Sequence, residues 1–187
     1  PVGVYFILSL AVIAFGSLGY FMSTANDTVL LVLKDLIIYS HLGYGIIFLF
    51  YVFANFGSML NQNLQVHKVL YKPNTMPYFT FRLMGLTCTF GFLIFDTNWR
   101  TPINQSFAAY YNSFGDLHLL EGDTEGAEAY YKKSVLFRNQ NHHAHYALAA
   151  INAARLEPRN ELSELIAAAE SYPPEQTLVN LIDAYRR

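Results

Sequence analysis

Cysteine, charged residues and basic runs are scarce in this chain, and each scarcity excludes a class of protein. Cys88 is the only cysteine of the 187 residues, so the chain cannot be a scaffold built on internal disulfides. Charged residues make up 14% of the sequence, the net charge is −2, and no run of Lys or Arg is present. We therefore expect no nucleic-acid partner, because nothing in the chain would neutralise a row of phosphates.

The few charges are distributed unevenly, and this divides the chain in two. The sequence holds 12 Lys and Arg and 14 Asp and Glu residues, but only seven of these lie among residues 1–96. The mean hydropathy of +0.21 is therefore the average of a membrane-like part and a soluble-like part. We predict an integral membrane domain at residues 1–98 and a soluble domain at residues 99–187.

Three segments are apolar and long enough to cross a membrane as helices. Residues 2–22 carry no charge and approach the ~20 residues that a span needs. Residues 36–56 form the second predicted span and residues 77–95 the third, with Arg82 near enough to one end for its guanidinium to reach the headgroups. Residues 28–38 are either an extension of the second span or a separate interfacial helix.

Basic residues in the short connections predict the orientation of the chain. Lys68 and Lys72 lie between the second and third predicted spans, whereas Asp27 is the only charged residue in the short loop at residues 23–27, which follows the first span. Because basic connections stay on the cytoplasmic side, residues 57–76 are expected in the cytoplasm. The soluble domain is then exocytoplasmic, with Trp99 as an interfacial anchor, and we expect a bacterial inner membrane.

The soluble part contains a helix-turn-helix pattern. Residues 108–141 predict two helices separated by a turn at residues 121–123, with Thr124 as the N-cap of the second helix. This segment resembles a tetratricopeptide repeat, a unit of 34 residues. The resemblance rests on large aromatic and small residues at the family's positions, namely Tyr111, Phe114, Gly115, Ala127, Tyr131 and Ser134.

A second unit of the same kind is expected to begin at His142, followed by a lone helix at residues 177–187. Glu161 stands where the family has a small residue at the point of closest helix packing. The resemblance covers roughly residues 103–187. It implies an all-α fold, in which about three transmembrane helices precede a short array of helical hairpins. Repeats of this family usually stack in threes or more, so the missing contacts are expected from the membrane domain, another subunit or further repeats.

The resemblance also implies a partner-binding groove, which this family lines with residues of the first helix of each repeat. Carried over to this sequence, the groove residues are Asn112, Asp116, Leu119, His143, Tyr146 and Asn180. Family members that hold a peptide's terminal carboxylate use basic groove residues, and Asp116 contradicts that set. A weakly polar protein surface is therefore the expected partner.

Histidines and one arginine are the remaining candidate site residues. His142, His143 and His145 are the only cluster with metal-ligand character, but on a helix position 143 points away from the other two. We expect a solvated helix start there, and no metal. His41, inside the second span, is expected to face protein or water, either as a ligand or as a neutral histidine bonded to a neighbouring helix. Arg82 either snorkels or binds an anionic lipid.

These patterns favour a protein without catalytic residues or a cofactor in this chain. Phosphate-loop, nucleophile-elbow and zinc-protease motifs are absent from the sequence. We predict a membrane-anchored scaffold, or an accessory subunit of a membrane complex, that binds protein partners in or at the bilayer. The alternative is enzymatic. The chain begins with Pro1 and has few spans, so it would be the C-terminal portion of a larger glycosyltransferase or O-antigen ligase-like enzyme, some of which resemble this plan.

Overall fold

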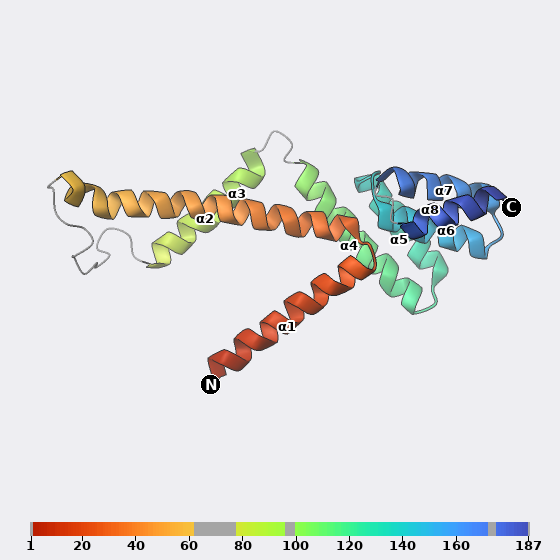
Figure 1. The fold of residues 1–187 in the computed structure, drawn as a ribbon, viewed down its shortest axis with the longest axis horizontal. Coiled ribbons are helices and arrows are strands. Elements are labelled where there is room, and N and C mark those ends of the chain that lie inside the picture. Colours follow the sequence, from red (N-terminus) through yellow and green to blue (C-terminus); the bar gives the residue numbers. More distant parts are fainter. Residues whose placement is uncertain (1, 62–77, 96–99, 172–174, 187) are drawn as a thin grey trace. The chain divides into compact units, whose positions relative to one another are not determined.

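The computed structural model describes residues 2–61, 78–95, 100–171 and 175–186 (Figure 1). Within these residues the chain forms eight helices and no strand, which confirms the predicted all-α class. The helices are α1 (Val2–Ser23), α2 (Asp27–Asn61), α3 (Tyr78–Phe95), α4 (Arg100–Leu120), α5 (Thr124–Phe137), α6 (His142–Ala154), α7 (Pro158–Ser171) and α8 (Glu175–Arg186). Lys68, Lys72 and Trp99 lie outside the described residues.

Contacts divide the chain into two units. The first unit comprises Pro1–Leu33 and Arg100–Arg187, and the second comprises Lys34–Trp99. This division does not coincide with the change in composition near residue 98, because α1 and the first turns of α2 belong to the same unit as the C-terminal helices. The N-terminal apolar helix and the soluble-like part of the sequence are therefore parts of one structural unit.

Two helical segments are candidate membrane spans by length and composition, Val2–Ser23 and Asp27–Ala54. No residue of α1 is buried within the protein. A helix appears as α3 where the third span was predicted, but it is not among the candidates, so the structure supports two spans rather than three. The physical reason is that α3 has 18 residues, which is close to the lower limit of ~17 for a spanning helix, and one of them is Arg82.

The two alternatives for residues 28–38 differ in whether a break precedes the second span. α2 is continuous from Asp27 to Asn61 and is 35 residues long. The N-terminal part of this helix therefore runs directly into the segment that was predicted to cross the membrane.

Glycines set the packing of the second unit, in which α3 lies against the C-terminal part of α2. A Cβ atom added to Gly43 would lie 2.8 Å from the backbone nitrogen of Thr89, and one added to Gly85 would collide with the ring of Tyr44. Small residues are used in this way where helices approach closely in membranes. By contrast, a Cβ atom added to Gly16 of α1 would meet nothing within 4 Å.

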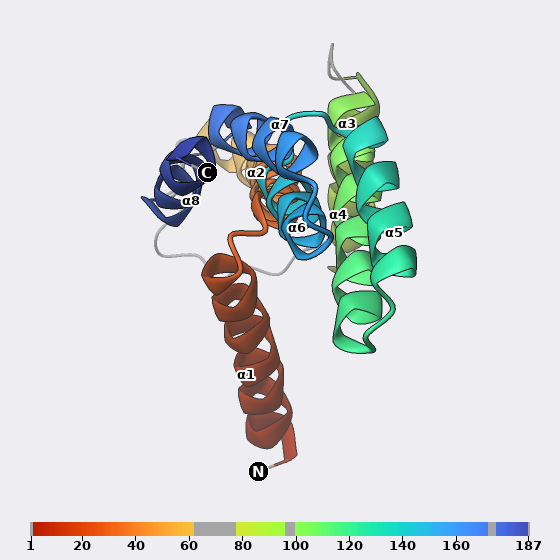
Figure 2. The same ribbon diagram turned by 90° about the vertical axis from the view of Figure 1, so that its right-hand side faces the viewer.

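The C-terminal helices form consecutive pairs, with α4 against α5 and α6 against α7, followed by α8 against α7 (Figure 2). The second helices of the two pairs begin at Thr124 and Pro158, one 34-residue period apart. The helix pairs expected at residues 108–141 and from His142 onward are therefore present. α4 begins at Arg100, well before the predicted start of the first pair.

The first pair packs as its small residues predicted. A Cβ atom added to Gly115 would lie 2.6 Å from the Tyr131 ring, so only glycine allows this approach. Tyr131 and Ala127 have no exposed surface, and they form one apolar cluster with residues of α6. The predicted cap was wrong by one residue: the side chain of Asp123, not Thr124, accepts from the backbone nitrogen of Gly126 at 2.9 Å.

Candidate interaction groove

The turn between α1 and α2, residues 24–28, contacts two of the predicted groove residues, Asn112 and His143, and we call it the α1–α2 corner. Ala25 adopts a left-handed conformation with φ of 50°, which ends α1. Asn26 then caps α2, because its Oδ1 accepts from the backbone nitrogen of Val29 at 3.4 Å. Asn26 and Thr28 have no exposed surface. This short polar turn between two apolar helices is therefore buried within the first unit.

Three buried asparagines join the corner to α4 and α6. The Nδ2 of Asn112, on α4, donates to the Oδ1 of Asn26 at 3.3 Å and to the Oδ1 of Asn141 at 3.1 Å. Asn141 returns a bond from its Nδ2 to the Oδ1 of Asn112 at 3.2 Å. It also caps α6 by accepting from the backbone nitrogen of Ala144. One side chain of α4 thus connects the caps of two other helices.

An ion pair lies beside the asparagines. Arg138, which follows α5, donates to the carboxylate of Asp27 at 2.6 Å and to the hydroxyl of Thr28 at 3.3 Å. The side chains of Arg138 and Asp27 are only 19% and 15% exposed. Removing one partner would leave a charge that is largely withdrawn from water, which is costly. The pair therefore fixes the corner against the end of α5.

His143 connects the corner to Asp116 of α4. Its Nδ1 lies 3.0 Å from the carbonyl oxygen of Thr24 and its Nε2 lies 2.6 Å from the Asp116 carboxylate. Both neighbours are acceptors, so the doubly protonated ring satisfies both contacts. Burial opposes that charge, but the hydrogen bond and the charge of Asp116 outweigh it, and the pKa of His143 is raised. Asp116 also accepts from the phenol of Tyr131 at 2.7 Å.

The other two histidines of the cluster have different partners. His145 lies between the carboxylate of Glu164 at 2.6 Å and the carbonyl oxygen of Asn139 at 2.8 Å. Burial opposes its charge, but these two contacts raise its pKa. His142 contacts the hydroxyl of Thr177 at 2.9 Å, and burial lowers its pKa. The expected solvated helix start is wrong, because all three rings are buried or nearly so and hydrogen-bonded.

No set of three metal-ligating side chains lies close together within the described parts of the chain. The three histidines connect α6 to its neighbours by hydrogen bonds. Each ring contacts a different element: the α1–α2 corner and α4 for His143, α7 for His145 and α8 for His142.

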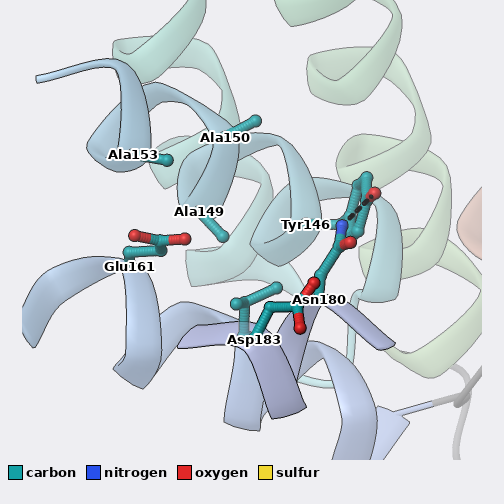
Figure 3. A pocket seen from close by; sticks show the side chains of 8 residues that line it. Tyr146, Ala149, Ala150, Ala153, Glu161, Asn180 and Asp183 are labelled. Carbon is teal, nitrogen blue, oxygen red and sulfur yellow. Dashed lines mark hydrogen bonds between the residues drawn. The ribbon is translucent and has the colours of Figure 1, made fainter. Parts of the chain in front are cut away.

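The remaining part of the groove is an open pocket between α6, α7 and α8 (Figure 3). Its volume is about 290 Å³. The lining combines a wall of small apolar residues with polar groups, namely Tyr146, Ala149, Ala150, Ala153, Glu161, Leu165, Asn180 and Asp183. At its rim the Nδ2 of Asn180 donates to the Tyr146 hydroxyl at 2.7 Å, which holds both side chains in place (Figure 3).

The six predicted groove residues therefore fall into two sets. Asn112 and His143 contact the α1–α2 corner directly, and Asp116 is bonded to His143, so the chain itself fills that part of the groove. Tyr146 and Asn180 lie at the open pocket. Leu119 is 42% exposed and lines a smaller hollow beside the corner.

The two candidates in the membrane part both lie in the second unit. His41 is exposed on α2, and its Nδ1 is 2.8 Å from the carbonyl oxygen of Ile37 in its own helix. Arg82 is exposed on α3.

Sequence reasoning missed the residues that dock the corner, Asn26, Asp27, Arg138 and Asn141. A local signal existed for two of them, since an asparagine before an apolar helix is a typical N-cap. No signal linked these caps to each other, because Asn26 and Asn112 are 86 residues apart in the sequence.

Comparison with protein-family models, with curated proteins and with solved structures finds no match to this chain. The fold therefore defines only a class, a helical protein with two candidate membrane spans and an array of paired helices.

The histidines predict how stability depends on pH. His143 and His145 have raised pKa values in the folded chain, so their stabilising effect is complete below ~6.5, the ordinary histidine value. That effect is lost as the pH rises through the raised values. His142 acts in the opposite sense, since its lowered pKa contributes stability that is lost as the pH falls.

We expect His143→Gln to reduce the loss of stability between about pH 6 and pH 9. The measurement is the apparent Tm of the whole chain in mild detergent, followed by its helical circular dichroism. His41→Gln, at an exposed position of the second unit, is the control and should keep the wild-type pH dependence. An unchanged pH dependence in His143→Gln would contradict the assignment of a charged ring to the corner.

Proposed function

We propose that this protein is a membrane-anchored scaffold, or an accessory subunit of a membrane complex, that binds a protein partner through its helical array. The observation that supports this proposal is that the groove has two parts that differ in what occupies them. One part is filled by the chain's own α1–α2 corner, whereas the pocket between α6, α7 and α8 remains open with polar groups at its rim. A groove that is held rigid on one side and open on the other is suited to recognition.

The last helix supports the same proposal. Leu178, Ile182 and Tyr185 recur at intervals of four and three on α8 and are 43%, 52% and 65% exposed. The spacing of such residues is typical of a helix face that is covered by another surface. An assembly in which a partner covers this face accounts for its composition.

The docked corner also supports the predicted membrane topology. The corner and the helical array belong to one unit, so both lie on the same side of the membrane. The basic residues Lys68 and Lys72, which follow α2 in the sequence, favour a cytoplasmic position for the segment after the second candidate span.

The topology predicts a difference in labelling between two introduced cysteines. The background is Cys88→Ala, which removes the only natural thiol. Leu136→Cys, at an 85% exposed position of α5, should react with an impermeant maleimide in intact cells, and Lys68→Cys should react only after permeabilisation. The reverse pattern would place the array in the cytoplasm, and equal labelling of both positions would contradict their assignment to opposite sides of the membrane.

Partner binding is tested by site-specific photocrosslinking in native membranes. A small diazirine amino acid at Ala150, an exposed residue at the pocket, should give an adduct with a second polypeptide. The same amino acid at Leu136, outside the groove, is the control and should give much less. Recovery of the chain alone and monomeric in mild detergent, with no adduct from Ala150, would refute the proposal.

A further inference from the structure

The pocket between α6, α7 and α8 contains a buried acid that has no counter-charge. Glu161 is 9% exposed, and its carboxylate faces the pocket below Ala149 and Ala153 (Figure 3). Its side chain has no hydrogen-bond or ionic partner among the described residues. A carboxylate withdrawn from water in this way is unfavourable unless a cation or a hydrogen-bond donor reaches it.

Four other acids of the array have a basic partner. Asp116 contacts His143, Asp123 contacts His118 and Glu164 contacts His145. Glu128 lies between Lys132 and Arg155. Glu161 is the buried acid among the described residues of the array, and it faces a cavity instead of a basic side chain.

Two of the described residues that line the pocket are acidic, and none of them is basic. Asp183 of α8 lines the same cavity as Glu161, and none of the residues that line it is Lys, Arg or His. The two carboxylates come from different helices, so they face a shared space rather than a single exposed helix surface. Charge complementarity therefore selects a cationic group for this cavity.

The shape of the pocket selects a side chain rather than a larger ligand. The volume of about 290 Å³ lies at the lower end of small-molecule sites. Its apolar wall, formed by Ala149, Ala150, Ala153 and Leu165, suits the methylene stem of a long basic side chain. A metal ion is not favoured, because the described residues offer no group of three ligating side chains.

We propose that this acidic pocket receives a lysine or arginine side chain of the partner polypeptide, with its cationic head at Glu161 and Asp183. This inference rests on the proposed function, since it names the chemistry of the partner that the groove binds. The basic side chain supplies the counter-charge that Glu161 lacks, and the hydrogen-bonded pair of Tyr146 and Asn180 borders its entrance.

The test is the yield of the photo-adduct formed from Ala150 in variants of the whole chain in native membranes. Glu161→Gln should lower the yield by about tenfold or more, because truncating one partner of a buried charge pair is costly. Asp183→Asn, at the exposed side of the pocket, should lower the yield less, by a few-fold. Glu170→Gln, at an exposed position of α7, is the matched control and should leave the yield unchanged. The adduct peptide of the partner should carry a Lys or Arg within a few residues of the crosslinked position.

The outcomes separate the two proposals. An adduct whose yield is the same in Glu161→Gln and Asp183→Asn as in Glu170→Gln would overturn the basic side chain but leave the scaffold function standing. An adduct peptide without Lys or Arg near the crosslink would do the same. The absence of an adduct in the wild type and in every variant would overturn both. The apparent Tm of each variant is measured alongside, and Asp183→Asn, at an exposed residue, keeps the test decisive if Glu161→Gln alters folding.

Discussion

The buried polar contact between the α1–α2 corner and the helical array is the interaction on which the rest of the structure depends. Asn112 bridges the caps of α2 and α6, and the Asp27–Arg138 ion pair closes the same junction. If the corner and the array separated only partly, each of these groups would lose its hydrogen bonds within the protein without gaining bonds to water. The contact is therefore specific in geometry as well as stabilising, since buried polar groups tolerate few alternative arrangements.

This contact explains how a short array is completed. Paired helices bury their apolar faces by stacking, and arrays of about three or more units are usually needed. The corner supplies part of the missing surface on one side, by occupying the groove at Asp116 and His143. On the other side the pocket at Glu161 and the apolar face of α8 are left open. The chain thus fills one part of its groove with its own residues and leaves the other part open.

Much of the helical part was predictable because its signals are local. The 34-residue period placed the start of α6 at His142, and the small residues Gly115 and Ala127 indicated where helices approach closely. Composition also located the two apolar helices that are candidate spans. These features depend on neighbouring residues and on side-chain size, which the sequence states directly.

The docked corner and the roles of the histidines were not predictable, because they depend on contacts between distant parts of the chain. His143 was expected at a solvated helix start, but its partners are the Thr24 carbonyl and Asp116. Similarly, Glu161 looked like an unfavourable substitution at a packing position, and only the three-dimensional structure shows that it lines a cavity. The sequence shows which residues are polar but not which groups they meet.

The most direct measurement of the central claim is a double-mutant cycle on Asp27 and Arg138. The free energy of unfolding of the chain in mild detergent is compared for Asp27→Ala, Arg138→Ala and the double variant. If the corner is docked on the array, the two effects should couple by about 1 kcal/mol or more, as for residues in direct contact. Effects that add to within about 0.5 kcal/mol, as for distant sites, would contradict the contact and with it this account of how the array is joined to its membrane helices.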